Sequence, residues 1–318
     1  MIVAFLDLLG FSKLLEKDEQ TAVDNLVSFN NVIKTRIIDD FTNSVQNDAE
    51  NQDSKRFAQN CSVSSFENLI SVSDSLIIGS NNYELFISQL SNLIATIYIE
   101  YSEPFKKSFN DISEVSSNRI YSATYTGEII AHRAFPLLFR GGISLGENVS
   151  FFENFHILNS NCKKTSLNIV GGTYLKAVKL EKCGKGPRIF CDSSVVNHIS
   201  NKNVFKCIDK EKDVFELVWT IEACEVLERF ENCWDNVTAS ISRKMLPAAI
   251  NLYKYYFNCD KLKSCYTELL TLVCEGIIKY AHDKCGRKDD AIRLIQSQLD
   301  KADIDFTIDV DILNDFLR

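Results

Sequence analysis

Residues 4–12 read AFLDLLGFS, an apolar run typical of a buried β-strand that contains one carboxylate and ends in a glycine turn. Burying a carboxylate costs free energy unless a cation or hydrogen-bond donors pair with it. A purely hydrophobic core gains nothing from Asp7, so its position near the end of a strand predicts a metal site. A metal site at this point needs a second carboxylate.

The second carboxylate lies in residues 68–80, NLISVSDSLIIGS, where two β-rich runs meet at Asp74. This pattern predicts a hairpin with Asp74 at its tip. Oxygen ligands suit Mg²⁺ or Mn²⁺ and leave room for phosphate oxygens. After Asp7, Gly10 allows a tight turn, and a helix that starts near Ser12 would direct the backbone N–H groups around Phe11 toward a phosphate.

Composition limits the possible classes of protein. The 318 residues are 45% hydrophobic and 25% charged, which indicates a globular chain with one large domain or two ordinary ones. The net charge of −8 argues against broad nucleic-acid binding. No apolar run reaches the length of a membrane span, and the first residues lack the basic region of a secretory signal. Eleven cysteines without a C-x-x-C pair, and four scattered histidines, predict reduced core thiols in a cytoplasmic protein and no zinc site.

Hydrophobic periodicity predicts the elements. A helix is expected over about 12–38, with the buried stripe Leu14, Leu15, Val23, Leu26, Val27 and Ile33, and a solvated polar insertion over about 39–65. Further helices are expected over 83–101 and before Pro136. A strand is expected at 137–149, followed by a strand, a Gly-Gly turn and a helix over 166–182.

Three short strands follow, in PRIFCD, NVFKCI and DVFELVWT. After Thr220 the apolar residues recur at helical spacing. We therefore expect an α+β domain over 1–220 and a helical extension over 221–318.

Four segments, taken in order, resemble the class III nucleotidyl cyclases. FLDLLGFS resembles the family's first metal-binding strand, F-x-D-x-x-G-F-[ST], and SVSDSLII resembles its second metal-binding hairpin, with Ser73 at the usual glycine. FRGGISLGE is similar to the strand R-x-G-I-x-x-G-x, and NIVGGTYLKAVKLE to the helix G-x-x-V-N-x-A-x-R-L-e. The resemblance covers about residues 2–219. It implies a cyclase catalytic domain, with a ferredoxin-like mixed sheet and flanking helices, plus the C-terminal helical extension.

The resemblance also implies roles for the matching residues. Asp7 and Asp74 would hold two divalent ions, Mn²⁺ or Mg²⁺, and the carbonyl group of Leu8 would assist. The ribose 3′-hydroxyl would attack the α-phosphorus in line and release pyrophosphate. Arg140 would contact phosphate. In this family the active sites are shared between the two protomers of a head-to-head homodimer.

Two helix positions depart from the family pattern. The family's transition-state Asn and Arg lie four residues apart on one helix face and correspond here to Leu175 and Lys179. Lys179 keeps a positive charge but lacks the bidentate fork of arginine, and Leu175 donates no hydrogen bond. Lys176 is a neighbouring candidate to compensate. Lys206 or Lys210, near the last hairpin, corresponds to the lysine that reaches the terminal phosphates.

The base-reading positions are Ile70, where adenylyl cyclases have Lys, and Asn168, where they have Asp. A carboxamide both donates and accepts, so it suits cytosine and uracil equally. These features resemble the pyrimidine cyclases of the Pycsar antiphage system. The resemblance implies conversion of CTP or UTP to cyclic CMP or cyclic UMP, as a signal for a separate effector protein.

Two alternatives remain open. The chain could be an adenylyl or guanylyl cyclase with rearranged base contacts. It could also be a catalytically degenerate cyclase fold that binds a nucleotide or dimerises, an alternative that Leu175 and Lys179 favour and the two metal carboxylates oppose. The absence of a G-G-[DE]-E-F segment argues against a diguanylate cyclase.

Overall fold

The computed structural model describes residues 1–17, 19–38, 59, 62–107, 119–123, 129–133, 136–157, 163–226, 228–306, 308, 316 and 317. The strands are β1 (Ile2–Leu8), β2 (Asn68–Val72), β3 (Ser75–Ser80), β4 (Arg119–Ala123), β5 (Ile129–Arg133), β6 (Phe139–Leu145), β7 (Ser150–Ile157), β8 (Lys163–Val170), β9 (Ile189–Cys191), β10 (Phe205–Asp209) and β11 (Val214–Leu217). The α-helices are α1 (Phe11–Lys17), α2 (Glu19–Val32), α5 (Tyr83–Tyr101), α6 (Gly172–Leu180), α7 (Ser193–Val196), α8 (Cys233–Ala239), α9 (Leu246–Tyr256), α10 (Asp260–Cys285) and α11 (Lys288–Lys301).

Seven strands form a mixed sheet in the order β10-β11-β9-β6-β1-β3-β2. The β6–β9 pair is parallel, and β1 pairs antiparallel with both β3 and β6. A strand that is paired and covered on both faces has to be apolar almost throughout, which the run IVAFLDL of β1 satisfies except at Asp7. The expected mixed sheet with flanking helices is confirmed.

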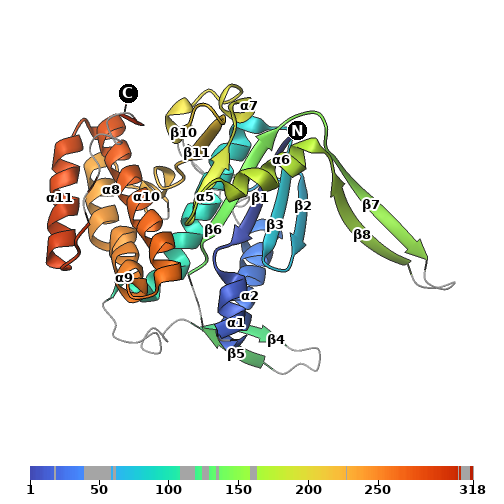
Figure 1. Ribbon diagram of the computed structural model, residues 1–318, viewed down its shortest axis with the longest axis horizontal. Helices are drawn as coiled ribbons and strands as arrows, with labels where there is room; N and C mark the ends of the chain where they lie inside the picture. Colours follow the sequence, from blue (N-terminus) through green and yellow to red (C-terminus); the bar gives the residue numbers. More distant parts are fainter. Residues whose placement is uncertain are drawn as a thin grey trace.

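The two faces of the sheet are covered by different helices. Leu6, Ile78 and Phe139 belong to the large core cluster that includes Phe29 of α2 and the buried face of α5. On the other face α6 lies across β1 and β6 (Figure 1). Because side chains alternate along a strand, Asp7 points to the face opposite that of Leu6, which is the α6 face.

The C-terminal helices pack beyond the β10 edge of the sheet, on the side opposite the β7–β8 hairpin (Figure 1). Tyr98 of α5 donates a hydrogen bond to the backbone oxygen of Met245 at 2.9 Å, and its ring meets Trp219 edge-on at 5.6 Å. The large core cluster contains residues from both sides of position 220. In the described part of the chain no helix combines the length and apolar character needed to cross a bilayer.

Most of the expected elements are found. The structure contains the expected hairpin at Asp74 (β2–β3), the helix over 83–101 (α5) and the strand–turn–helix over 166–182 (β8–α6). It also has the expected helical character after Thr220 (α8–α11). The helix expected before Pro136 is wrong, because β4 and β5 form an antiparallel pair there. This stretch is rich in Ile, Tyr and Thr, which favour strands.

The helix expected over 12–38 is divided into α1, α2 and a π-helical turn over Ile33–Ile38. Its expected stripe is partly wrong, because Leu15 and Val23 are 46% and 41% exposed. The buried face of α2 instead includes Ala22, Phe29 and the polar Asn25. Polar residues on this buried face explain why the hydrophobic pattern was misleading.

The polar insertion expected over 39–65 lies largely outside the described residues. Its last part is not solvated: Ser62 and Ser65 are buried, and Gln89 of α5 accepts hydrogen bonds from the backbone and side chain of Ser65. Nor are all the thiols in the core, since Cys183 and Cys207 are exposed.

Gly142 allows α6 to lie directly on β6, and its replacement provides a test of this packing. A Cβ atom there would lie 2.0 Å from the backbone oxygen of Ala177 and 2.8 Å from Cβ of Leu180. We expect Gly142→Ala to lower the free energy of unfolding by about 2 kcal/mol, measured by denaturant titration, because backbone atoms cannot move aside.

Gly172→Ala is the matched control. An added Cβ there would meet nothing nearer than 3.4 Å. We expect its free energy of unfolding to change by less than about 0.5 kcal/mol. Equal effects at the two glycines would contradict the close packing of α6 on the sheet.

Candidate active site

Asp7 lies at the end of β1, on the face of the sheet that α6 covers. Its side chain is 15% exposed, and both carboxylate oxygens have partners. Ser75 of β3 donates to Oδ1 at 2.9 Å, and Arg140 of β6 donates to Oδ2 through Nε at 3.0 Å and Nη2 at 2.8 Å. Both partners stand directly opposite Asp7 in the strand register. The burial cost of the carboxylate is thus offset by neighbouring strands.

Asp74 comes next to Asp7 through the β2–β3 turn. The turn consists of Ser73 and Asp74, and the N–H group of Leu8 donates to the backbone oxygen of Asp74 at 3.0 Å. Ser73 has φ 55°, in the left-handed region that favours glycine. Glycine adopts this conformation without a steric penalty, whereas serine does not. The structure therefore places the two candidate metal carboxylates on adjacent backbone segments.

The chain turns at Gly10 into α1. Gly10 has φ 80°, and no atom lies within 4 Å of where its Cβ would stand. Its carbonyl group accepts a hydrogen bond from Leu14 at 3.0 Å, so the first turn of α1 begins here. Phe11 packs against the core, whereas Ser12 is exposed. A phosphate contact at Gly10, Phe11 and Ser12 stays a prediction.

Glu181 is a member of this cluster that the sequence reasoning missed. It follows α6 directly, is 3% exposed, and its Oε1 lies 2.6 Å from Nε of Arg140. The Nε–H bond is directed at Asp7, and Oε1 of Glu181 makes no aligned hydrogen bond. Burial raises the pKa of Glu181, and the positive charge of Arg140 opposes this shift. The available signal was a carboxylate at the end of an amphipathic helix, where the sequence reads KLEK.

The cluster fits a divalent cation in its chemistry. Two carboxylates, on Asp7 and Glu181, flank the single guanidinium of Arg140, which leaves an excess of negative charge and only oxygen ligands, and the backbone of Asp74 contacts β1 next to Asp7. Among the residues described, no three His, Cys, Asp or Glu side chains form a ready-made metal cluster. A cation would therefore rest on the two aspartates and on groups supplied by a ligand or by water.

The exposed face of α6 carries the positions that depart from the cyclase pattern. Leu175 is 53% exposed, and Lys179 is exposed with no ion pair among the described residues. Lys176 forms an ion pair with the buried Asp192 at 2.6 Å. To compensate for the departures at Leu175 and Lys179, Lys176 would have to leave this ion pair. Lys179 is the more available cation.

The two positions expected to read the base lie on different sheets. Ile70 is on β2, the edge strand of the large sheet, opposite Ile77. Asn168 is on β8, opposite Phe152 of β7, in the hairpin that projects from the body of the protein (Figure 1). Their joint action on a base stays a prediction.

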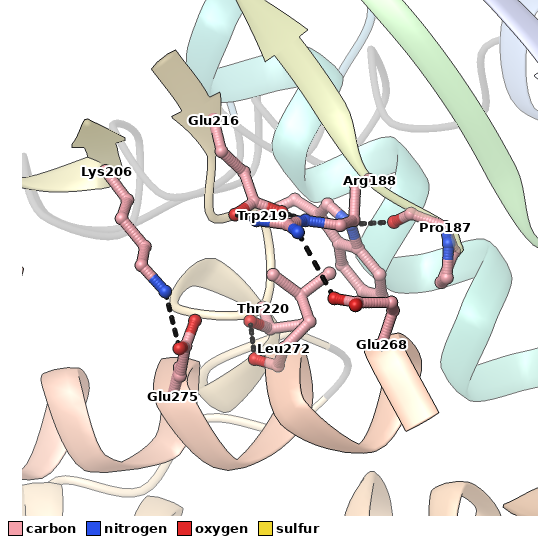
Figure 2. A network of polar contacts seen from close by, with 9 residues as sticks. All are labelled: Pro187, Arg188, Lys206, Glu216, Trp219, Thr220, Glu268, Leu272 and Glu275. Atoms are coloured by element: carbon pink, nitrogen blue, oxygen red, sulfur yellow. Dashed lines mark hydrogen bonds and ion pairs between the residues drawn. The ribbon is translucent and has the colours of Figure 1, made fainter. Parts of the chain in front are cut away.

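Lys206 has a different environment from the one expected. Its ammonium group lies 2.5 Å from Oε1 of Glu275 in α10, and the two side chains are only 11% and 9% exposed (Figure 2). Beside them Arg188 pairs with the fully buried Glu216 at 2.5 Å and with Glu268 at 3.2 Å. The expected phosphate contact of Lys206 has no support from this placement, because the C-terminal helices cover β10 and supply its partner.

No family model and no curated protein matches the chain. The catalytic core of a rhodopsin-guanylyl cyclase with converted specificity, solved with ATPαS, is 16% identical, with a TM-score of 0.35 over 68% of this chain and 93% of that one. A non-canonical dimeric guanylyl cyclase domain from the aquatic fungus Blastocladiella emersonii is 15% identical, with a TM-score of 0.34 over 68% and 92%. Because both TM-scores are below 0.5, we draw nothing further from these similarities.

The pair formed by Lys206 and Glu275 gives a test that separates a structural lysine from a ligand-binding one. Lys206→Met leaves a buried carboxylate without its cation, so we expect the free energy of unfolding to fall by roughly 3 kcal/mol at neutral pH. Burial already raises the pKa of Glu275, and removing the lysine raises it further. The folded state then favours protonated Glu275, so the loss should shrink as the pH falls toward 4.5.

Lys210→Met, at the exposed alternative position, is the control and should leave the denaturation midpoint unchanged. Similar midpoints for both variants would show that the pair with Glu275 contributes nothing.

Proposed function

We propose that this chain is a nucleotidyl cyclase that converts CTP or UTP into 3′,5′-cyclic CMP or cyclic UMP and pyrophosphate. The observation that carries the proposal is that the turn holding Asp74 contacts β1 next to Asp7, which is bonded to Arg140, just before the turn that Gly10 makes into α1. Oxygen ligands, a guanidinium and free backbone N–H groups are the parts that hold a metal-bound triphosphate.

Each group has a defined task in this proposal. Bound Mn²⁺ or Mg²⁺ ions supply activation of the 3′-hydroxyl group and neutralise the triphosphate. Asp7 and Asp74 hold these ions, with the carbonyl group of Leu8 as a further ligand. Arg140 contacts phosphate once it leaves Asp7, and the N–H groups at Phe11 and Ser12 cradle phosphate oxygens.

The proposed assembly is a homodimer with shared sites. Lys179 projects from the exposed face of α6 and would reach the phosphates bound by the partner copy, where it stabilises the charge of the transition state. Large apolar side chains are exposed on the same side of the sheet and on the projecting hairpin, which supports self-association: Val72, Phe152, Leu167, Val170 and Leu175.

The base preference rests on Ile70 and Asn168. Ile70 offers no hydrogen bond to a purine, and the Asn168 carboxamide can serve cytosine or uracil. A purine bound here would leave part of its hydrogen-bonding edge unpaired, at a cost of about 1–3 kcal/mol per buried group. The proposed biological role is a cyclic pyrimidine signal in antiphage defence, read by a separate effector.

A catalytically degenerate nucleotide-binding module is the second candidate. Two observations favour it: Leu175 cannot donate a hydrogen bond, and Arg140 is bonded to Asp7 instead of pointing to an open site. The assay below separates this candidate from the cyclase.

The proposed activity is tested by incubating the protein with each of the four NTPs and Mn²⁺, followed by product identification by mass spectrometry. We expect cyclic CMP or cyclic UMP, and no product from folded Asp7→Ala or Asp74→Ala, because one carboxylate cannot hold both ions. Mainly cyclic AMP or cyclic GMP would overturn the pyrimidine assignment. Nucleotide binding without any product would favour the degenerate module.

The shared site is tested by mixing two inactive variants, Asp7→Ala and Lys179→Ala. Half of the dimers in an equal mixture are mixed, and each has one intact site, so activity should return to roughly a quarter of the wild-type level. Light scattering would measure the oligomeric state. Full activity of a monomer would contradict the shared site.

A further inference from the structure

Arg140 and a divalent cation compete for the same oxygen atoms. Oδ1 of Asp7 accepts from Ser75, and Oδ2 accepts two hydrogen bonds from Arg140. A cation that binds Oδ2 displaces this guanidinium, because the two positive charges repel each other and the lone pairs are already used. Cation binding at Oδ2 therefore requires a second position for Arg140.

Glu181 provides that position. Its Oε1 already lies 2.6 Å from Nε of Arg140 but makes no aligned hydrogen bond. Its side chain is only 4% exposed, so an unpaired carboxylate would be costly there. Its backbone is held in place, because α6 ends against β6 so closely that a Cβ on Gly142 would lie 2.9 Å from the Glu181 nitrogen.

We infer that Glu181 is a positioning residue that receives Arg140 when Asp7 binds a divalent cation. The inference rests on the proposed metal site at Asp7. A small rotation of the guanidinium exchanges its hydrogen bonds with Asp7 for aligned bonds with Glu181. Arg140, whose side chain is 42% exposed, then stays at the edge of the site with its outer N–H groups free for phosphate.

This arrangement links metal binding to the orientation of the arginine. Without Glu181, Arg140 would have Asp7 as its only carboxylate partner among the described residues and would oppose the cation. Without Arg140, the cation would have no competitor. Glu181 thus affects the metal through Arg140, which distinguishes it from a metal ligand.

The test measures Mn²⁺ binding to nucleotide-free protein by isothermal titration calorimetry, with free Mn²⁺ checked by electron paramagnetic resonance. We expect Glu181→Gln to weaken binding by about tenfold and Arg140→Gln to strengthen it, because residues in one ion-pair network are coupled. In the Arg140→Gln background, Glu181→Gln should change the affinity by less than about threefold. Glu211→Gln, which removes an exposed carboxylate, is the charge control and should have no effect.

The outcomes separate this inference from the proposed function. Equal weakening by Glu181→Gln in both backgrounds would show that Glu181 acts on the cation directly, and would overturn the inference. If Asp7→Asn abolishes binding but Glu181→Gln leaves it unchanged, the inference falls and the metal site stands. If Asp7→Asn leaves binding unchanged, both fall. Glu181→Asp keeps the charge, and its Mn²⁺ affinity should lie between those of the wild type and Glu181→Gln. It takes the place of Glu181→Gln if the Gln variant is unstable.

Discussion

A carboxylate at the end of a central strand must find partners that the sheet itself supplies. β1 is paired on both sides, so the residues opposite Asp7 are fixed by register as Ser75 and Arg140. Because side chains alternate along each strand, all three point to the face that α6 covers. The location of the candidate site, the hydrogen bonds of Asp7 and the approach of Asp74 all follow from this pairing.

The charges in this cluster do not balance. Arg140 is the only cation that forms ion pairs with Asp7 and Glu181 in the described part of the chain, so two carboxylates share one positive charge. Burial raises the pKa of Glu181, and the positive charge of Arg140 opposes this shift. A divalent cation would restore the balance, and an arginine with two carboxylate partners can give way to it without leaving the site.

The C-terminal helices contribute a second buried ionic cluster, at the β10 edge of the sheet. Lys206 and Glu275 connect β10 to α10, and Arg188 connects the fully buried Glu216 to Glu268 (Figure 2). Buried ion pairs add little net stability compared with apolar packing, but breaking one partner is costly. These pairs join α10 to the sheet. They also explain why a lysine near the last hairpin faces the protein interior.

The sequence by itself determined the elements whose signals are local. Residue type and spacing within one segment are enough to predict four features: the β1 run, the hairpin at Asp74, the helix over 83–101 and the change to helices after Thr220. Asp7 was also identified locally, because a carboxylate in an apolar strand is costly wherever the strand lies. The β4–β5 pair and the exposed Leu15 show where a local pattern is ambiguous.

Only the tertiary structure decided which charges meet. Asp7 and Arg140 are 133 residues apart in the chain, and Lys206 and Glu275 are 69 apart. Their pairing depends on strand register and on how α6 and α10 pack, which no local pattern contains. Glu181 was overlooked for the same reason: a glutamate at a helix end is ordinarily solvated, and here the close contact of α6 with Gly142 buries it beside Arg140.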